Sequence, residues 1–347
     1  MTPLKVIFLA DTRPGHYHLA QGVITALERL CPVEVTRVPA VRRWIVPTRW
    51  LRRRITSENF FPPRMLRMAY RIDADALPQA DLVISAGGET LMPNICVTRF
   101  LGVPNIYCGS LLRGLGPENF SLVISSYDRD AGSPRHLVTL KPSSIDPEQL
   151  GRPAKVPRYG AKRHPQLAGL VIGGNAGPFR YQRSEWERLL AFVEDVSAGW
   201  GTRWLISTSR RTPADVADRI AKLALNGKVV ARFIDYRTAG PGTLPEIFAR
   251  AEVIVCTEDS STMISEAVSA RLPVVAVAPA AHRFTDEEQA YRAMLIDKGW
   301  CRVLPIAALT PPTLAAALSE IEPLATNPLD ALAATLQERL PQLFATG

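Results

Sequence analysis

One segment of the 347-residue chain has four consecutive polar residues between an apolar run and a helical pattern. The segment follows the apolar residues 253–257 and consists of Glu258, Asp259, Ser260 and Ser261. Hydroxyl and backbone N–H groups at the start of a helix favour a phosphate group, because the helix carries partial positive charge there. About one helical turn further on, the carboxylate of Glu266 can accept hydrogen bonds from ribose hydroxyls. The segment thus predicts a nucleotide site.

The same segment also permits a purely structural interpretation. Thr262 can cap the helix, with Ser265 or Glu266 closing a capping box. A capping box does not explain four consecutive polar residues, so we favour the nucleotide site.

Two more loops after apolar runs carry groups that suit a diphosphate. The first loop contains Gly173, Gly174 and Asn175. Its glycines let the backbone approach a pyrophosphate with exposed N–H groups. The second loop contains Ser209, Arg210 and Arg211, and guanidinium groups match phosphate oxygens. The alternatives are an ordinary glycine turn for the first loop and a solvated helix start before Pro213 for the second.

The first half of the chain carries a candidate general base. The first apolar run is followed by Asp11, Arg13, Gly15 and His16. His16 is the best candidate, because imidazole titrates near neutral pH, and Asp11 is the second. The alternative is that His16 only caps a helix. A later strand–glycine–helix pattern contains Gly87, Gly88 and Glu89. These residues and Arg13 and Gly15 are expected to line an acceptor site, with a tight structural turn as the alternative.

Short apolar runs alternate with helical patterns along the chain, which is typical of parallel sheets covered by helices. Strands are expected at 5–10, 33–38, 81–86, 104–108, 122–125, 168–172, 203–207, 229–234, 253–257, 273–278 and 302–304. Helices are expected at 16–30, 90–101, 184–198, 213–225, 244–250, 262–270 and 286–298. The candidate residues therefore follow strands, where open α/β sheets bind ligands. The expected fold class is α/β, with two Rossmann-like domains facing across a cleft.

A proline-rich stretch without periodicity, residues 141–166, separates the two halves and predicts a linker. We expect an N-terminal acceptor domain at 1–145, a linker at 146–166, a C-terminal nucleotide-sugar domain at 167–325 and a helical tail at 326–347. The apolar fraction of 47% and the charged fraction of 21% argue against disorder.

The net charge of +8 comes from one stretch. Residues 37–71 contain ten arginines and one acid, Glu58, so this stretch carries 10 − 1 = +9 and the rest of the chain 8 − 9 = −1. Within it, Trp44 and Trp50 lie among aliphatic and arginine residues, a mixture that suits an anionic membrane surface. We expect membrane contact through Arg42–Arg54. The alternatives are a solvated arginine face with inward-packed tryptophans and a nucleic-acid patch; because the charge is local, no nucleic-acid partner is expected.

Several sequence features bear on compartment and cofactors. The cysteines at 31, 96, 108, 256 and 301 form no C-x-x-C pair and are expected to be reduced thiols. No apolar run approaches the ~18 residues of a membrane span, and Val6–Ala10 is too short for a signal-peptide core. No histidine spacing predicts a metal site. We expect a cytoplasmic protein, peripheral on the inner face of the plasma membrane, without metal or cofactor.

Four motifs occur in order between about residues 6 and 304, namely Asp11–His16, Ile172–Gly174, Thr208–Thr212 and Thr257–Ala267. Together they resemble the bacterial glycosyltransferase family named after a plant mitochondrial-fission protein, which implies a GT-B architecture. The layout is more loosely similar to the lipid-linked N-acetylglucosaminyl transferase of peptidoglycan synthesis. On that resemblance Gly15 and His16 match its first loop, Gly87 and Gly88 its acceptor loop, and Glu266 its ribose-binding acid.

The resemblance implies a metal-independent glycosyltransferase. It would move a sugar from a nucleoside diphosphate sugar to a hydroxyl acceptor, lipid-linked or glycan, at the cytoplasmic membrane face. The donor would bind the second domain and the acceptor the first. Two other functions remain open: a nucleotide-sugar 2-epimerase of the same architecture, and a non-catalytic membrane-associated adaptor.

Overall fold

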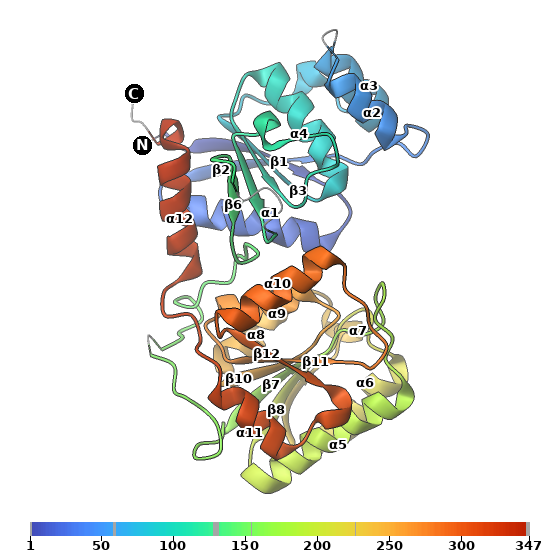
Figure 1. Cartoon of the computed structure of the whole chain (residues 1–347), viewed down its shortest axis with the longest axis vertical. Helices are drawn as coiled ribbons and strands as arrows, with labels where there is room; N and C mark the ends of the chain where they lie inside the picture. The colour runs from blue at the N-terminus through green and yellow to red at the C-terminus, as the bar shows by residue number, and fades with distance from the viewer. Residues whose placement is uncertain (1, 58–59, 128–131, 154, 226, 345–347) are drawn as a thin grey trace. The chain divides into compact units, whose positions relative to one another are not determined.

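The computed structural model describes residues 2–57, 60–127, 132–153, 155–225 and 227–344. Residue 154 of the expected linker and residues 345–347 of the expected tail lie outside this description. The chain forms two compact units, one of Met1–Ser144 with Leu329–Gly347 and one of Ile145–Pro328 (Figure 1). Each unit is a parallel sheet covered by helices, so the expected α/β class with two Rossmann-like units is confirmed.

The sheet of the first unit has six parallel strands in the order β2-β1-β3-β4-β5-β6. The strands are β1 (Leu4–Ala10), β2 (Val33–Pro39), β3 (Leu82–Ala86), β4 (Asn105–Cys108), β5 (Leu122–Ser125) and β6 (His136–Val138). The main helices are α1 (Pro14–Leu27), α2 (Thr48–Ile55), α3 (Pro62–Tyr70), α4 (Gly88–Leu101) and α12 (Pro328–Arg339).

Strands β1, β3, β4 and β5 are buried on both faces of this sheet, whereas the edge strand β2 is largely exposed. Successive side chains of a strand point to opposite faces. In β1, Val6 and Phe8 pack with α1 and α12, whereas Ile7 and Leu9 pack with α2, α3 and α4. The consequence for the site is that β1 and β3 are adjacent interior strands of this sheet. The loops that follow their carboxyl ends are therefore neighbours.

The sheet of the second unit is also parallel, with the order β12-β11-β10-β7-β8-β9. Its strands are β7 (Leu167–Val171), β8 (Arg203–Ser207), β9 (Val230–Ile234), β10 (Val253–Thr257), β11 (Val274–Ala278) and β12 (Cys301–Pro305). Its helices are α5 (Arg183–Trp200), α6 (Ala214–Ala224), α7 (Tyr236–Ala239), α8 (Leu244–Arg250), α9 (Ser261–Ser269), α10 (Asp286–Asp297) and α11 (Pro311–Ser319). The loops after β7, β8 and β10 thus leave the same edge of the sheet from adjacent strands.

The last helix, α12, belongs to the core of the first unit. Leu329, Leu332 and Leu336 are buried there among side chains of β1 and α1. The Arg339 guanidinium also donates a 2.8 Å hydrogen bond to the carbonyl of Pro134. The chain therefore returns to its first unit after completing the second. Within the described residues, no helix is both long and apolar enough to cross a membrane.

Candidate active site

The loops after β8 and β10 are joined by an ion pair. Asp259 Oδ2 accepts hydrogen bonds from Arg211 Nη2 at 2.5 Å and Nε at 3.2 Å, and its Oδ1 accepts one from the Tyr181 hydroxyl at 3.1 Å. The Asp259 side chain is fully buried. A buried carboxylate is tolerated only when it is paired and hydrogen-bonded. Asp259 and Arg211, both predicted donor ligands, are therefore engaged with each other and fix the shape of this edge.

The glycine loop after β7 fits closely against these two loops. The Gly173 N–H donates to Thr257 Oγ1 at 2.7 Å. A Cβ at Gly173 would lie 2.2 Å from Asp259 Oδ2, and one at Gly174, where φ is +152°, would lie 2.1 Å from the Arg211 carbonyl oxygen. Both glycines are therefore required by the protein's own packing.

Hydroxyl groups complete the connection between the loops after β7 and β8. Ser209 Oγ donates to the Gly173 carbonyl at 3.0 Å, and Thr212 Oγ1 donates to the same carbonyl at 2.8 Å. Asn175 Oδ1 accepts from the Tyr181 N–H at 2.8 Å. Arg210 is exposed, in contrast to Arg211. Arg210 is therefore the more exposed of the two arginines, while the Arg211 side chain, 31% exposed, is paired with Asp259.

Helix α9 begins at Ser261, in the loop that follows β10. Ser260 is its N-cap and accepts a hydrogen bond from the Met263 N–H at 3.4 Å. A structural cap is therefore present, but Ser260 forms it and not Thr262. Ser265 Oγ bonds the Ser261 carbonyl at 2.6 Å and the Tyr291 hydroxyl at 2.5 Å. The helix start, with its N–H groups, lies directly after the loop that carries Asp259.

Glu266 lies inside this helix and is 7% exposed. Burial raises the pKa of its carboxyl to about 7. Desolvation disfavours the charged form of an acid, which explains the direction. A buried carboxyl that titrates near neutral pH, in the second turn of the helix that follows β10, is a candidate for binding a ligand that supplies hydrogen-bond donors.

Glu258 was expected to bind the donor, but it is engaged with Arg292 of α10. The Arg292 Nε donates to Glu258 Oε1, and Nη1 donates to Glu288 Oε2 at 3.1 Å. The side chains of Glu258 and Arg292 are 0% and 7% exposed. Burial raises the pKa of Glu258, and the neighbouring guanidinium opposes that rise. This pair anchors α10 to the end of β10.

Three residues that hold this edge together, Tyr181, Thr212 and Arg292, were missed by sequence reasoning as site residues. Thr212 stood within a recognised motif. Arg292 gave one usable signal, since it follows Glu288 by four residues on a predicted helix. Tyr181 gave none, because its partner Asp259 is distant in sequence.

In the first unit, Asp11 and His16 form a pair at the end of β1. His16 Nδ1 lies 2.6 Å from Asp11 Oδ2, and Asp11 Oδ1 accepts from the Arg13 N–H at 2.9 Å. The side chains of His16 and Asp11 are 25% and 4% exposed. A carboxylate at Nδ1 leaves Nε2 as the nitrogen that can accept a proton. The arrangement suits a general base, His16, whose ring is oriented by the carboxylate of Asp11.

The glycine turn after β3 lies against this histidine. A Cβ at Gly87, where φ is +86°, would lie 2.0 Å from His16 Nδ1, whereas one at Gly88 would meet nothing within 4 Å. Gly15 lies in the first turn of α1, and the Arg13 side chain is exposed. Glu89 pairs with Arg42, with Oε2 3.2 Å from Nε. Of the residues predicted for the acceptor, Gly87 is the one that directly packs on the candidate base.

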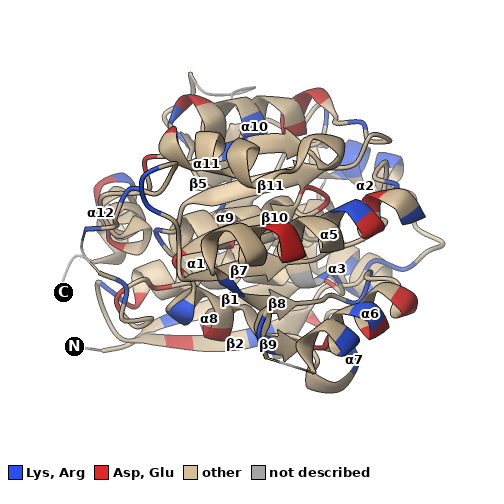
Figure 2. Cartoon of the chain, turned by 90° about the horizontal axis from the view of Figure 1, so that it is seen from below, with Lys and Arg blue, Asp and Glu red and all other residues tan. Residues whose placement is uncertain are grey.

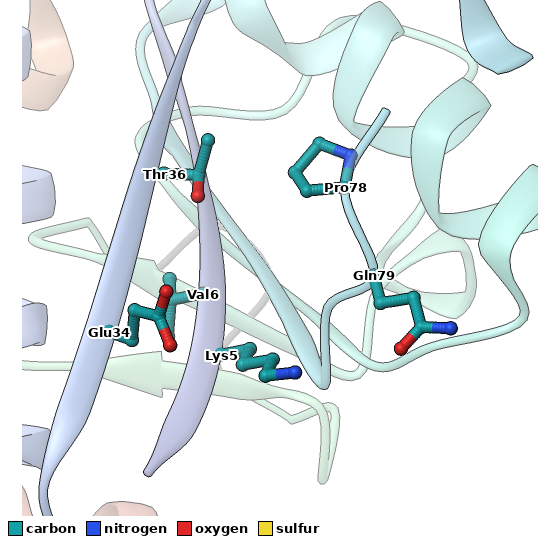
Figure 3. Close-up of a pocket in the computed structure, with 6 residues that line it drawn as sticks. All are labelled: Lys5, Val6, Glu34, Thr36, Pro78 and Gln79. Carbon is teal, nitrogen blue, oxygen red and sulfur yellow. The ribbon is translucent and has the colours of Figure 1, made fainter. Parts of the chain in front are cut away.

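A pocket of about 290 Å³ lies elsewhere on the first unit, lined by Lys5, Val6, Glu34, Thr36, Pro78 and Gln79 (Figure 3). Pro78 and Gln79 precede β3, and Lys5 and Val6 lie in the first half of β1. Parallel sheets bind ligands beyond the carboxyl ends of their strands. This pocket is therefore separate from the candidate site. Among the described residues, no group of three or more His, Cys, Asp or Glu side chains is placed to hold a metal ion.

Comparison with known proteins adds a family and a fold. The family model described as "Mitochondrial fission ELM1" matches residues 14–340. No curated protein matches the chain. The structure is similar to Acinetobacter baumannii MurG, with 14% identity and a TM-score of 0.51 over 97% of this chain and 100% of that one.

Two epimerase structures are similar over comparable lengths. The Methanocaldococcus jannaschii UDP-GlcNAc 2-epimerase has 13% identity and a TM-score of 0.56 over 98% of this chain and 100% of its own. The Neisseria meningitidis UDP-GlcNAc 2-epimerase, whose structure holds UDP-GlcNAc, has 10% identity and a TM-score of 0.51 over 98% and 100%. At these identities the likeness establishes the fold, and it confirms the expected GT-B class.

Proposed function

The chain belongs to the mitochondrial fission ELM1 family, and from that membership and the site geometry we propose that it is a glycosyltransferase. The donor is a nucleoside diphosphate sugar bound at the carboxyl edge of the second sheet. The acceptor is a hydroxyl compound, lipid-linked, bound by the first unit at the cytoplasmic face of a membrane. The reaction uses no metal ion.

The observation that carries the proposal is the joined set of loops after β7, β8 and β10. Their hydrogen bonds to Asp259 and to the Gly173 carbonyl fix the edge before a ligand arrives. Such preorganised polar groups stabilise the charge that develops on a leaving group. The N-terminus of α9 and the guanidinium of Arg210 supply positive charge for the diphosphate. Glu266 accepts hydrogen bonds from the ribose hydroxyls.

The Asp11–His16 pair supplies the base. In an inverting transfer, His16 Nε2 takes the proton of the acceptor hydroxyl as its oxygen bonds to the anomeric carbon. The bond from that carbon to the diphosphate oxygen breaks, and the electron pair leaves with the diphosphate. Asp11 holds the ring at 2.6 Å and stabilises the imidazolium that forms. General-base catalysis of this kind contributes about 10²–10⁴-fold to the rate.

The test begins with calorimetry of the full chain against a panel of nucleoside diphosphate sugars, with UDP-GlcNAc first. The best ligand is then followed for transfer to added hydroxyl acceptors and for hydrolysis. We expect His16→Asn to retain donor binding and lose turnover, while the control His18→Asn retains both. Equal turnover in wild type and His16→Asn would remove His16 from the chemistry.

Two outcomes would replace the proposal by its rivals. Exchange of solvent deuterium into the sugar at C2, without transfer, would identify a 2-epimerase. Failure of every nucleotide and nucleotide sugar to bind a folded chain would favour a non-catalytic adaptor.

A further inference from the structure

One segment of the first unit exposes an unusual number of large apolar side chains. Of the eight such side chains among the described residues, five lie between β2 and β3, namely Val41, Trp44, Ile45, Phe61 and Met68. Trp44 is 91% exposed and Phe61 63%. A single exposed apolar residue needs no explanation, but several gathered in one segment indicate a contact surface.

The segment is folded and anchored by its inner face. Leu51 and Ile55 of α2, and Met65 and Leu66 of α3, are buried against the first unit's core. Figure 1 shows α2 and α3 at the periphery of that unit, outside the sheet. The exposed apolar side chains are therefore those that remain after the helices have packed.

Trp44 and Ile45 form the tip of a tight turn, closed by a 3.0 Å hydrogen bond from the Val46 N–H to the Arg43 carbonyl. The Arg43 N–H donates to the Ala69 carbonyl at 2.8 Å. The Arg42 guanidinium, which pairs with Glu89, also donates to the Val46 carbonyl. The turn therefore presents its two apolar side chains from a fixed base.

Exposed arginines lie in the same segment as these apolar residues. They are Arg49, Arg53, Arg54, Arg64, Arg67 and Arg71, on the two helices and just after them. Figure 2 shows Lys and Arg in blue on α2. Arg67 is in an exposed pair with Asp73. The stretch 37–71 carries +9 by sequence. The exposed arginines and the five apolar residues are called here the docking surface.

We propose that the docking surface binds an anionic lipid bilayer, with Trp44 and Ile45 entering the headgroup layer. Indole rings favour that layer, and arginine side chains attract anionic lipids. A nucleic acid would account for the arginines but would leave the exposed aliphatic side chains of Val41 and Ile45 without a role. Electrostatic attraction and apolar insertion together match a lipid surface.

The turn that carries Trp44 and Ile45 is connected to the candidate acceptor loop through Arg42. Arg42 at the base of the turn pairs with Glu89, which follows the Gly87–Gly88 turn beside His16. An acceptor that is itself anchored in the bilayer would therefore reach this loop from the side of the turn. The docking itself does not depend on sugar transfer, because it concerns the binding of the chain to lipid.

The experiment is cosedimentation of the full chain with phosphatidylcholine vesicles, with and without phosphatidylglycerol. Trp44→Ser/Ile45→Ser removes the apolar tip, and Arg53→Ser/Arg54→Ser removes exposed charge. Arg52 is left unchanged because its guanidinium holds the Arg113 carbonyl at 2.6 Å. Leu225→Ser is the matched control, since Leu225 is 86% exposed on the second unit.

We expect binding to the anionic vesicles, weakened about tenfold or more in each double variant and unchanged in Leu225→Ser. Circular dichroism of each variant checks that the fold is intact. Absence of binding to anionic vesicles at low salt would overturn the proposal, as would equal binding of wild type and Trp44→Ser/Ile45→Ser. Tighter binding to single-stranded RNA than to vesicles, insensitive to Trp44→Ser/Ile45→Ser, would identify a nucleic-acid surface in its place.

Discussion

Replacing Glu266 by Gln should abolish a pH dependence of donor binding that the wild-type chain shows. Burial raises the pKa of the Glu266 carboxyl to about 7 in the unliganded protein. If the ionised carboxylate is the form that accepts hydrogen bonds from ribose, only the ionised fraction is competent to bind. That fraction is about 9% at pH 6 and about 91% at pH 8, and the apparent Kd varies inversely with it. The apparent Kd should therefore fall about tenfold between pH 6 and pH 8.

The assay is isothermal titration calorimetry with a nucleoside diphosphate sugar, whose diphosphate does not titrate between pH 6 and pH 8. Below pH 7 the wild-type chain should also release a proton on binding, seen as a heat that depends on the buffer. Glu266→Gln has the shape of the neutral acid and should bind weakly, with one affinity at every pH. The same pH dependence in both proteins would refute the assignment of Glu266 to the ribose.

Stability gives an independent measure of the same group. The folded pKa lies above the ordinary value of 4.5, so the folded chain holds this proton more tightly than the unfolded chain. Its contribution to stability is fully present below pH 4.5 and is lost as the pH rises to about 7. At 1.36 kcal/mol per pH unit, the loss amounts to about 3 kcal/mol. Urea titrations should show wild type losing stability relative to Glu266→Gln over this window; parallel pH profiles would contradict the burial of a titrating carboxyl.

Two further substitutions test the first unit, one at the glycine turn beside His16 and one in the packing of α12. Gly87→Ala should lower turnover by about 10²-fold or more and leave donor binding unchanged, because the added Cβ would displace the His16 ring. Turnover of the variant equal to that of the wild type would show that the position of the ring does not matter. Leu336→Ala should lower the free energy of unfolding by about 2–5 kcal/mol, because α12 is part of the first unit's core. Urea titrations measure this loss, and a loss below about 0.5 kcal/mol would contradict the packing of α12.

The fold was largely predictable because parallel strands buried on both faces leave continuous apolar runs in the sequence. Every strand and helix expected from such runs is present, with bounds that differ by a few residues. The short elements α2, α3, α7 and β6 were missed. In α2 and α3 the arginines dominate the sequence, and burial of Leu51 and Ile55 depends on contacts with distant α4. The return of α12 to the first unit likewise depends on tertiary contacts alone.

For the site, the sequence indicated which loops matter but not which side chains are already engaged. Consecutive polar residues such as Glu258 and Asp259 look alike as candidate ligands. Their partners, Arg292 and Arg211, are 34 and 48 residues away, and such pairings cannot be read from local patterns. The packing of Gly87 on His16 is another distant contact, which only the adjacency of β1 and β3 explains.

These engaged side chains also bear on how a diphosphate would be held. Asp259 is buried, negatively charged and close to the glycine loop, and alone it would repel an anionic ligand. Its pairing with Arg211 at 2.5 Å neutralises that charge inside the protein. Arg210, exposed on the same loop, and the start of α9 then remain as the positive groups of this edge. Two adjacent arginines thus differ in their surroundings: Arg211 is paired with Asp259, and Arg210 is exposed, which makes Arg210 the one we propose for the diphosphate.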